Sequence, residues 1–167
     1  MAVPEGTQQS GYAGDVTPAQ AWELLRENPD AVLVDVRTRA EWQFVGVPDA
    51  SELGRRVRFI EWIDFPSGNP NPGFVEQLRA ELQDAAAGES AGAGAESGGR
   101  PEDETAKAPV LFLCRSGGRS IGAATVATSA GLGPAYNVLE GFEGGRDARG
   151  HRGAAGWRAA GLPWCQS

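Results

Sequence analysis

One segment of the sequence holds residue types that can do chemistry together, the loop Cys114-Arg115-Ser116-Gly117-Gly118-Arg119-Ser120. Its glycines let successive backbone N–H groups turn toward one point, and a following helix would add the positive end of its dipole. A cysteine at that point has its thiolate stabilised by the N–H groups and by the two arginines. The loop therefore indicates that Cys114 is a nucleophile in an anion-binding cradle. The alternative is a buried structural cysteine at the end of a strand.

The spacing between the cysteine and the second arginine limits the size of the group that the loop can surround. Four residues separate Cys114 from Arg119, and Ser120 follows. Cysteine phosphatases place one residue more between the two, which widens the loop enough to surround a phosphoryl group. The shorter loop predicts a tighter ring, suited to a single sulfur atom or to the sulfonate end of thiosulfate.

This loop and three other segments together resemble the rhodanese-like sulfurtransferases, whose active loop also begins with cysteine. Residues 32–37 with Glu41-Trp42 look like the first strand of that family and the turn after it. Residues 45–50 are similar to its Gly-His-Ile-Pro-Gly-Ala motif, although Gly46 stands where histidine is usual. Residues 136–142 resemble the strand and turn that follow the loop helix. The resemblance covers about residues 17–145.

The hydrophobic pattern predicts elements that would position the loop. Thr17, Pro18 and Gln20 form a capping-box start for a helix that ends near Pro29. The other expected elements are strands at 32–36, 56–60, 109–113 and 135–139 and helices at 38–43, from Phe74 to Leu82, and at 118–130. This alternation predicts an α/β fold, a central parallel sheet flanked by helices on both faces, as the rhodanese-like resemblance also implies. Cys114 would then lie at the carboxyl end of a strand, where such sheets bind ligands.

Composition and charge favour a single soluble domain. The chain has 167 residues, 41% of them hydrophobic, and no apolar run long enough to span a membrane. The first ten residues lack the pattern of a signal peptide, so we expect a cytoplasmic protein. The net charge of −7 argues against nucleic acid or an anionic membrane as a partner. Two cysteines and one histidine do not form a metal site, so no metal or organic cofactor is expected.

The chain divides into four parts by composition. Residues 1–16 are expected to be an N-terminal extension, residues 17–145 the rhodanese-like domain, and residues 146–167 a tail that packs on it. A flexible insertion is expected within the domain at about 84–108. This stretch has six acidic and two basic residues and no Val, Ile, Leu, Met or aromatic side chain, so it cannot bury a core. Its alanine-rich start is compatible with one further turn of the preceding helix.

Several other residues have supporting or open interpretations. The fold would place Asp35 and Arg37 near the loop, where either could brace it, and Glu41 has the spacing to pair with Arg37. His151 is interpreted as a surface histidine, with a pocket role as the alternative. Cys165 is interpreted as a bystander thiol, the alternative being exchange with an oxidised or persulfidated Cys114.

The resemblance implies a two-step sulfur transfer through a Cys114 persulfide. The donor would be a small anion, thiosulfate or a related persulfide, and the acceptor cyanide, a thiol such as glutathione, or a protein thiol. Arg115 is assigned to the sulfonate, and Arg119 either shares that role or braces the loop through Asp35. Ser116, Gly117, Gly118 and Ser120 complete the substrate-binding loop. Two alternatives remain open: a persulfide carrier that serves a partner protein, and a cysteine phosphatase on the same fold.

Overall fold

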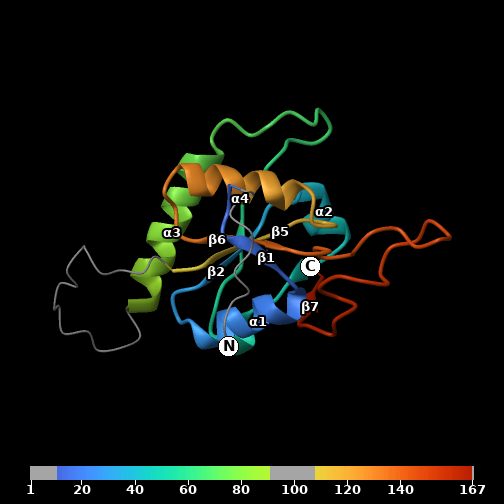
Figure 1. Cartoon of the computed structure of the whole chain (residues 1–167), viewed down its shortest axis with the longest axis horizontal. Helices are drawn as coiled ribbons and strands as arrows, with labels where there is room; N and C mark the ends of the chain where they lie inside the picture. Colours follow the sequence, from blue (N-terminus) through green and yellow to red (C-terminus); the bar gives the residue numbers. More distant parts are fainter. Residues whose placement is uncertain (1–10, 91–107, 167) are drawn as a thin grey trace.

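A five-stranded parallel sheet forms the centre of the molecule (Figure 1). The computed structural model describes residues 11–90 and 108–166. The strands follow the order β1-β6-β5-β2-β4, and every neighbouring pair is parallel. Their bounds are β1 (Gly14–Val16), β2 (Val32–Asp35), β4 (Arg58–Phe59), β5 (Val110–Leu113) and β6 (Ala135–Val138). The predicted α/β fold with a central parallel sheet is confirmed.

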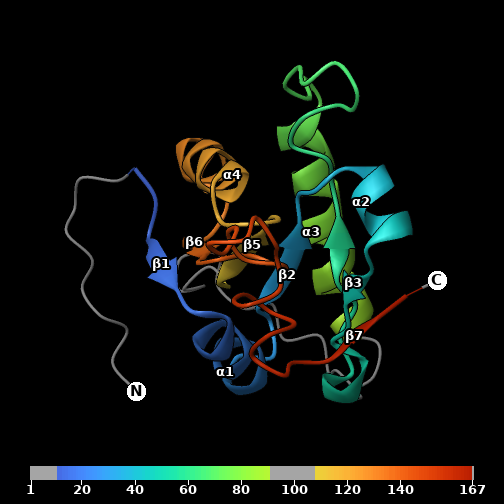
Figure 2. The same ribbon diagram turned by 90° about the vertical axis from the view of Figure 1, so that its right-hand side faces the viewer.

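Helices cover both faces of this sheet: Figure 2 shows α1 and α4 on opposite sides of it, and side chains of α3 share the core cluster of α4. The α-helices are α1 (Pro18–Glu27), α2 (Arg39–Phe44), α3 (Phe74–Ser90) and α4 (Arg119–Ser129). Thr17 caps α1 as predicted: its hydroxyl accepts from the Gln20 N–H at 3.1 Å, and the Gln20 side chain accepts from the Thr17 N–H at 2.9 Å. Among the described helices, none is long and apolar enough to cross a membrane.

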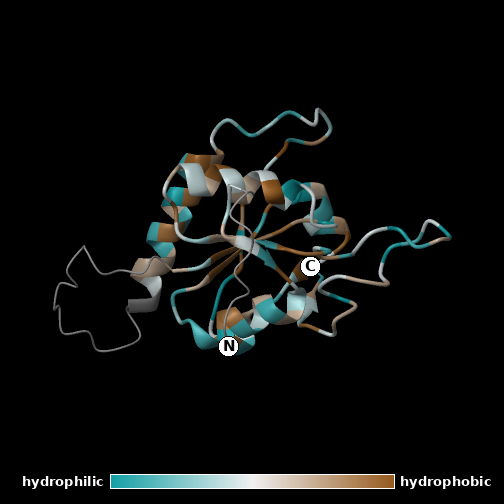
Figure 3. Cartoon of the chain, in the orientation of Figure 1, coloured by the Kyte–Doolittle hydropathy of each residue, from teal (hydrophilic) through white to brown (hydrophobic). Residues whose placement is uncertain are grey.

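Successive side chains of the central strands pack alternately into two hydrophobic cores, one on each face of the sheet. Val32 and Val34 of β2 belong to the core cluster with α3 and α4, whereas Leu33 belongs to the cluster with α1. In the same way, Phe112 of β5 faces α3 and α4, and Leu111 faces α1. Successive side chains of a strand point to opposite faces, so continuous apolar runs fill both cores. Figure 3 shows these hydrophobic strands at the centre and hydrophilic loops outside.

Two boundaries differ from those expected. Residues 14–16, placed in an N-terminal extension, form β1 and pair with residues 136–138 of β6. Residues 84–90, placed in a flexible insertion whose start was compatible with one further helical turn, continue α3 as far as Ser90 and so exceed that turn. Asp84 accepts a 2.5 Å hydrogen bond from Arg58, and Ala85 is buried in the core. The segment is helical despite its low hydrophobicity because alanine has a high helix propensity and the Arg58–Asp84 ion pair holds the helix to the domain. The rest of the expected insertion, residues 91–107, lies outside the described residues.

The C-terminal segment packs against the domain through a small second sheet. Strand β7 (Trp164–Cys165) pairs antiparallel with β3 (Val47–Pro48), which precedes the 3₁₀ helix η1 (Ser51–Leu53). Trp157 is fully buried in the core cluster on the α1 side. Its backbone N–H donates to the Gly141 carbonyl at 2.8 Å. The segment therefore contacts the turn after β6.

Candidate active site

The cysteine loop lies at the carboxyl edge of the central sheet. Cys114 follows β5 directly, and α4 begins at Arg119, so the loop joins a central strand to a helix. Open parallel sheets bind ligands at this edge. Cys114 itself is only 1% exposed, while Ser116 and Gly118 are exposed at the rim. The loop therefore holds a nearly covered sulfur atom between a central strand and a helix.

Two polar groups of the loop reach this sulfur. The backbone N–H of Gly117 donates to the Cys114 Sγ at 3.1 Å, and the Ser120 Oγ lies 3.2 Å from it. Gly117 has φ +94°, and a Cβ there would lie 3.0 Å from the Glu140 nitrogen. Glycine is needed because an L side chain would be strained at that φ and crowded by the neighbouring turn.

The turn after β6 holds the loop from behind. The N–H groups of Phe142 and Glu143 donate to the carbonyls of Cys114 at 2.8 Å and Arg115 at 2.9 Å. Gly141 makes this approach possible: its φ is +58°, and a Cβ would lie 2.2 Å from the Cys114 carbonyl oxygen. The loop conformation is therefore set by backbone bonds to a segment that follows it by more than twenty residues.

Arg119 and Glu41 join the loop to helix α2. The two guanidinium nitrogens of Arg119 donate to the two Glu41 oxygens at 2.7 and 2.8 Å. This corrects two expectations, the pairing of Glu41 with Arg37 and the bracing of Arg119 by Asp35. The physical reason is the start of α2, where Glu41 accepts from the Thr38 N–H at 2.9 Å and is held toward the loop. Arg119 thus braces the loop through Glu41.

This ion pair also sets the protonation of its members. Burial acts to raise the pKa of Glu41, but hydrogen bonds from Arg119 and Thr38 outweigh it and lower the pKa to about 2. The hydrogen bond to Glu41 raises the pKa of Arg119, and the charges of Glu41, Cys114 and Asp35 add to this effect. Both side chains stay charged across the physiological range, so the brace persists.

Asp35 and Arg37 form a second, fully buried ion pair near the loop. Arg37 donates to both oxygens of Asp35, at 2.7 Å for the shortest bond, and to the Gly46 carbonyl at 2.7 Å. Its guanidinium carbon lies 4.2 Å from the centre of the Phe142 ring. Phe142 in turn bonds to the Cys114 carbonyl. The pair therefore contacts the turn that supports the loop, and the hydrogen bonds of Arg37 go to Asp35 and Gly46.

The C-terminal strand accounts for the glycine at position 46. Gly46 has φ +114°, and a Cβ there would lie 2.9 Å from the Cys165 carbonyl oxygen and 3.0 Å from the Trp164 ring. The histidine usual in the resembling motif would meet β7. The Gly46 carbonyl accepts a hydrogen bond from Arg37, and the absence of a side chain at this position leaves room for the C-terminal segment.

Arg115 differs from Arg119 in its surroundings. Its side chain is half-buried, and its buried Nε has no hydrogen-bond partner in the described part of the chain. The backbone of Arg115 is held by Glu143, so the side chain starts from a fixed position. A buried guanidinium N–H without a partner is unusual, since such donors are normally satisfied.

Asn137 is a site residue that the sequence analysis did not single out. It is 1% exposed on β6, and its Oδ1 lies 2.5 Å from the Ser120 Oγ. Its Nδ2 donates to Asp15 of β1 at 2.9 Å. The signal in the sequence is a single amide within the apolar strand 135–138. Its link to the loop depends on the order of the strands.

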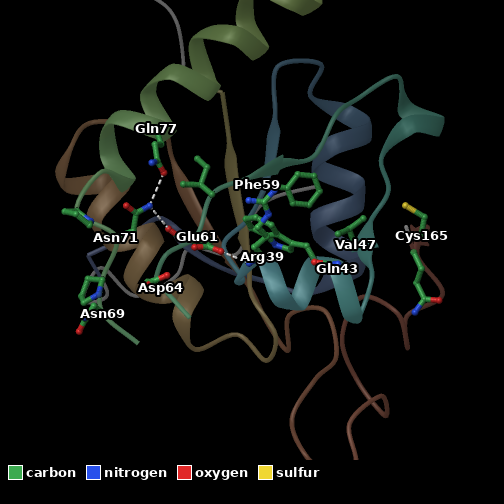
Figure 4. Close-up of a pocket in the computed structure, with 15 residues that line it drawn as sticks. Arg39, Gln43, Val47, Phe59, Glu61, Asp64, Asn69, Asn71, Gln77 and Cys165 are labelled. Atoms are coloured by element: carbon green, nitrogen blue, oxygen red, sulfur yellow. Dashed lines mark hydrogen bonds between the residues drawn. The ribbon is translucent and has the colours of Figure 1, made fainter. Parts of the chain in front are cut away.

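His151 and Cys165 lie apart from the loop contacts. His151 is exposed, and its backbone N–H donates to Asp147. Cys165 is exposed at one end of a groove of about 1040 Å³, which runs past Arg39 and Phe59 to Asn71 (Figure 4). None of the residues that line this groove belongs to the loop 114–120. Within residues 11–90 and 108–166, no three His, Cys, Asp or Glu side chains group into a metal site.

The fold and site define an α/β domain with a cysteine-initiated anion loop. The family model for the rhodanese-like domain matches residues 17–148, and the chain belongs to that family. An uncharacterized protein, RC0915, from Rickettsia conorii is 31% identical over 150 residues, covering 90% of this chain and 95% of that one.

Solved structures are similar over nearly the whole chain. Rv0390 from M. tuberculosis is 56% identical with a TM-score of 0.75, covering 93% of this chain and 99% of that one. The polysulfide-sulfur transferase homodimer from Wolinella succinogenes shares the fold at 21% identity and a TM-score of 0.53, covering 95% of this chain and 82% of that one.

The close approach at Gly141 is testable with a pair of glycine substitutions. We expect Gly141→Ala to lower the free energy of unfolding by about 2–4 kcal/mol, because a left-handed alanine is strained and its Cβ overlaps the Cys114 carbonyl. Gly145→Ala is the control, since a Cβ there meets nothing within 4 Å. Urea denaturation measures both. Equal stabilities of the two variants would contradict the role of this turn.

The Arg119–Glu41 brace predicts a pH-dependent loss of stability. The folded pKa of Glu41 is about 2 against an ordinary 4.5, so its contribution is complete above pH 4.5 and declines as the pH falls from 4.5 toward 2. Glu41→Gln should therefore be less stable than the unsubstituted protein by about 1.5–3 kcal/mol at pH 7. The difference should shrink at pH 3.

Urea unfolding at a series of pH values measures this difference. The exposed Glu52→Gln is the control and should show no pH-dependent difference. A Glu41→Gln deficit that is as large at pH 3 as at pH 7 would contradict the charged pair.

Proposed function

We propose that this protein is a sulfurtransferase that carries a sulfur atom on Cys114 between a small anionic donor and a thiophilic acceptor. The observation that carries the proposal is the environment of the Cys114 Sγ, which accepts a hydrogen bond from the Gly117 N–H inside a loop closed by Arg119, five positions after the cysteine. Such a setting stabilises negative charge on sulfur. Membership of the rhodanese-like family supports the same class of activity.

The reaction proposed has two balanced steps. The Cys114 thiolate attacks the outer sulfur of thiosulfate, a new S–S bond forms, and the old S–S bond breaks as sulfite leaves with its electron pair. Cys114 then carries the terminal persulfide anion. In the second step cyanide or a thiolate attacks that outer sulfur, and Cys114 leaves as the thiolate it was at the start.

The covered sulfur and the two arginines suggest how a donor is chosen. Cys114 is 1% exposed, so only a narrow terminal sulfur can reach it. Arg119 is engaged by Glu41 through both guanidinium nitrogens. Arg115 has a buried Nε–H that lacks a partner in the part of the chain that the structure describes, and this favours Arg115 as the group that binds the sulfonate of the donor.

The alternatives differ in measurable ways. A cysteine phosphatase would turn over an aryl phosphate, for which the short loop is too tight. A persulfide carrier would pass sulfur to a partner protein and react slowly with cyanide.

We also propose a cytoplasmic location, where reducing conditions keep Cys114 and Cys165 as the free thiols that the structure contains.

The covalent step is tested by mass spectrometry after treatment with thiosulfate. We expect an adduct of one sulfur atom, about 32 Da, that cyanide removes with release of thiocyanate. Cys114→Ser should lose the adduct and the activity, because a hydroxyl is a far weaker nucleophile here. Cys165→Ser is the matched control and should retain both. An adduct that persists in Cys114→Ser, or turnover of an aryl phosphate instead, would overturn the proposal.

Binding of the donor is tested at Arg115. Arg115→Ala should lower kcat/KM for thiosulfate about tenfold to a hundredfold, the loss of one charge-assisted contact of roughly 1.5–3 kcal/mol. Arg115→Lys should recover only part, since an ammonium lacks the planar fork. The exposed Arg149→Ala is the control. A small loss that disappears at high salt would instead show that Arg115 acts only through the general field.

A further inference from the structure

A chain of hydrogen bonds leads from the Cys114 sulfur to the edge of the sheet. The Ser120 Oγ lies 3.2 Å from the Cys114 Sγ and 2.5 Å from the Asn137 Oδ1. The Asn137 Nδ2 donates to the Asp15 Oδ1 at 2.9 Å, and the Tyr12 hydroxyl donates to the same oxygen at 2.9 Å. Ser120 and Asn137 are buried, whereas Asp15 is exposed on β1, the edge strand.

The hydroxyl of Ser120 has one proton, which it can donate in a hydrogen bond either to the Asn137 Oδ1 or to the Cys114 Sγ. If the proton points to the Asn137 Oδ1, the Ser120 oxygen presents a lone pair to Cys114 and can only accept from its S–H. If the proton points to Cys114, it stabilises the thiolate. The direction of this single proton therefore decides which form of Cys114 the serine favours.

Asp15 settles that direction through the amide of Asn137. A carboxylate only accepts, so the amide must turn its Nδ2 toward Asp15 and its Oδ1 toward Ser120. An amide oxygen also only accepts, and at 2.5 Å the Ser120 hydroxyl must donate to it. Tyr12 is held as a donor in the same way: burial raises the pKa of its hydroxyl first, and the bond to Asp15 raises it further.

We propose that Asp15 and Asn137 are positioning residues that turn the Ser120 proton away from Cys114 and so favour the resting thiol over the thiolate. The arrangement opposes the Gly117 N–H and the loop arginines, which favour the thiolate. It rests on the proposed sulfur transfer for its purpose: Cys114 stays a thiol until its proton leaves to solvent, and the Ser120 hydroxyl then turns to donate to the thiolate that remains.

Charged groups on the loop and on the elements next to it are left unaltered in the experiment. These groups are Arg115 and Arg119 on the loop, Asp35 and Arg37 after β2, Glu41 on α2, and Glu140 and Glu143 on the turn after β6. Because none of them is altered, a change that follows substitution of Asp15 reports on Asp15 and the bonds it makes.

The test measures the Cys114 side chain itself, without any sulfur donor. In a Cys165→Ser background with [3-¹³C]cysteine, the Cys114 Cβ resonance followed against pH gives the midpoint of thiol ionisation. We expect Asp15→Leu to move this midpoint to lower pH by about half a unit to one unit, because the amide can then rotate and release the Ser120 proton to the sulfur. Asp15→Asn keeps an acceptor for Asn137 and should move it by less than a third of that shift.

A double substitution separates hydrogen-bond direction from charge. In Ser120→Ala the hydroxyl is absent, so adding Asp15→Leu should leave the midpoint of the Ser120→Ala protein unchanged. The same shift in Asp15→Asn as in Asp15→Leu, or a shift that persists in Ser120→Ala, would overturn the proposal. Because the midpoint is read without thiosulfate, the result stands apart from the outcome for sulfur transfer.

Discussion

The site depends on two backbone hydrogen bonds, from the N–H groups of Phe142 and Glu143 to the carbonyls of Cys114 and Arg115. They fix the direction of the peptide units at the start of the loop, and the Gly117 N–H that meets the sulfur follows from that start. The supporting turn is itself anchored on both sides. The Leu139 N–H donates to the Val16 carbonyl of β1, and the Trp157 N–H of the C-terminal segment donates to the Gly141 carbonyl, both at 2.8 Å.

A loop held in this way is preorganised. Hydrogen-bond donors that already point at the sulfur need not reorient when negative charge forms on it. Fixed dipoles stabilise charge most effectively when no such reorientation is needed. The Arg119–Glu41 pair adds a second brace from α2, so that the loop is held by side chains on one side and by backbone on the other. Arg115 is the loop arginine that we propose binds the sulfur donor, because its buried Nε–H has no hydrogen-bond partner within residues 11–90 and 108–166.

Sequence alone could locate the loop and the alternation of the longer strands and helices, because both follow from local patterns of glycine, apolar runs and caps, but it did not locate β1, a strand of three residues. It could not identify the partner of Arg119, since Glu41 is 78 positions away and its spacing along the chain suggests a pair with Arg37 instead. The same holds for Asn137, which meets Asp15 across 122 positions only because β1 and β6 are neighbours. Gly46 is explained by β7, a strand of two residues too short to show a pattern.

Hydrogen exchange at the amides of Phe142 and Glu143 tests the central claim most directly. If the turn holds the loop throughout the native state, both amides should exchange only through global unfolding, with an opening free energy equal to that measured by urea denaturation. Exchange of either amide at a rate close to that of an unprotected peptide would contradict the account, because the loop carbonyls would then lack the bonds that set its shape.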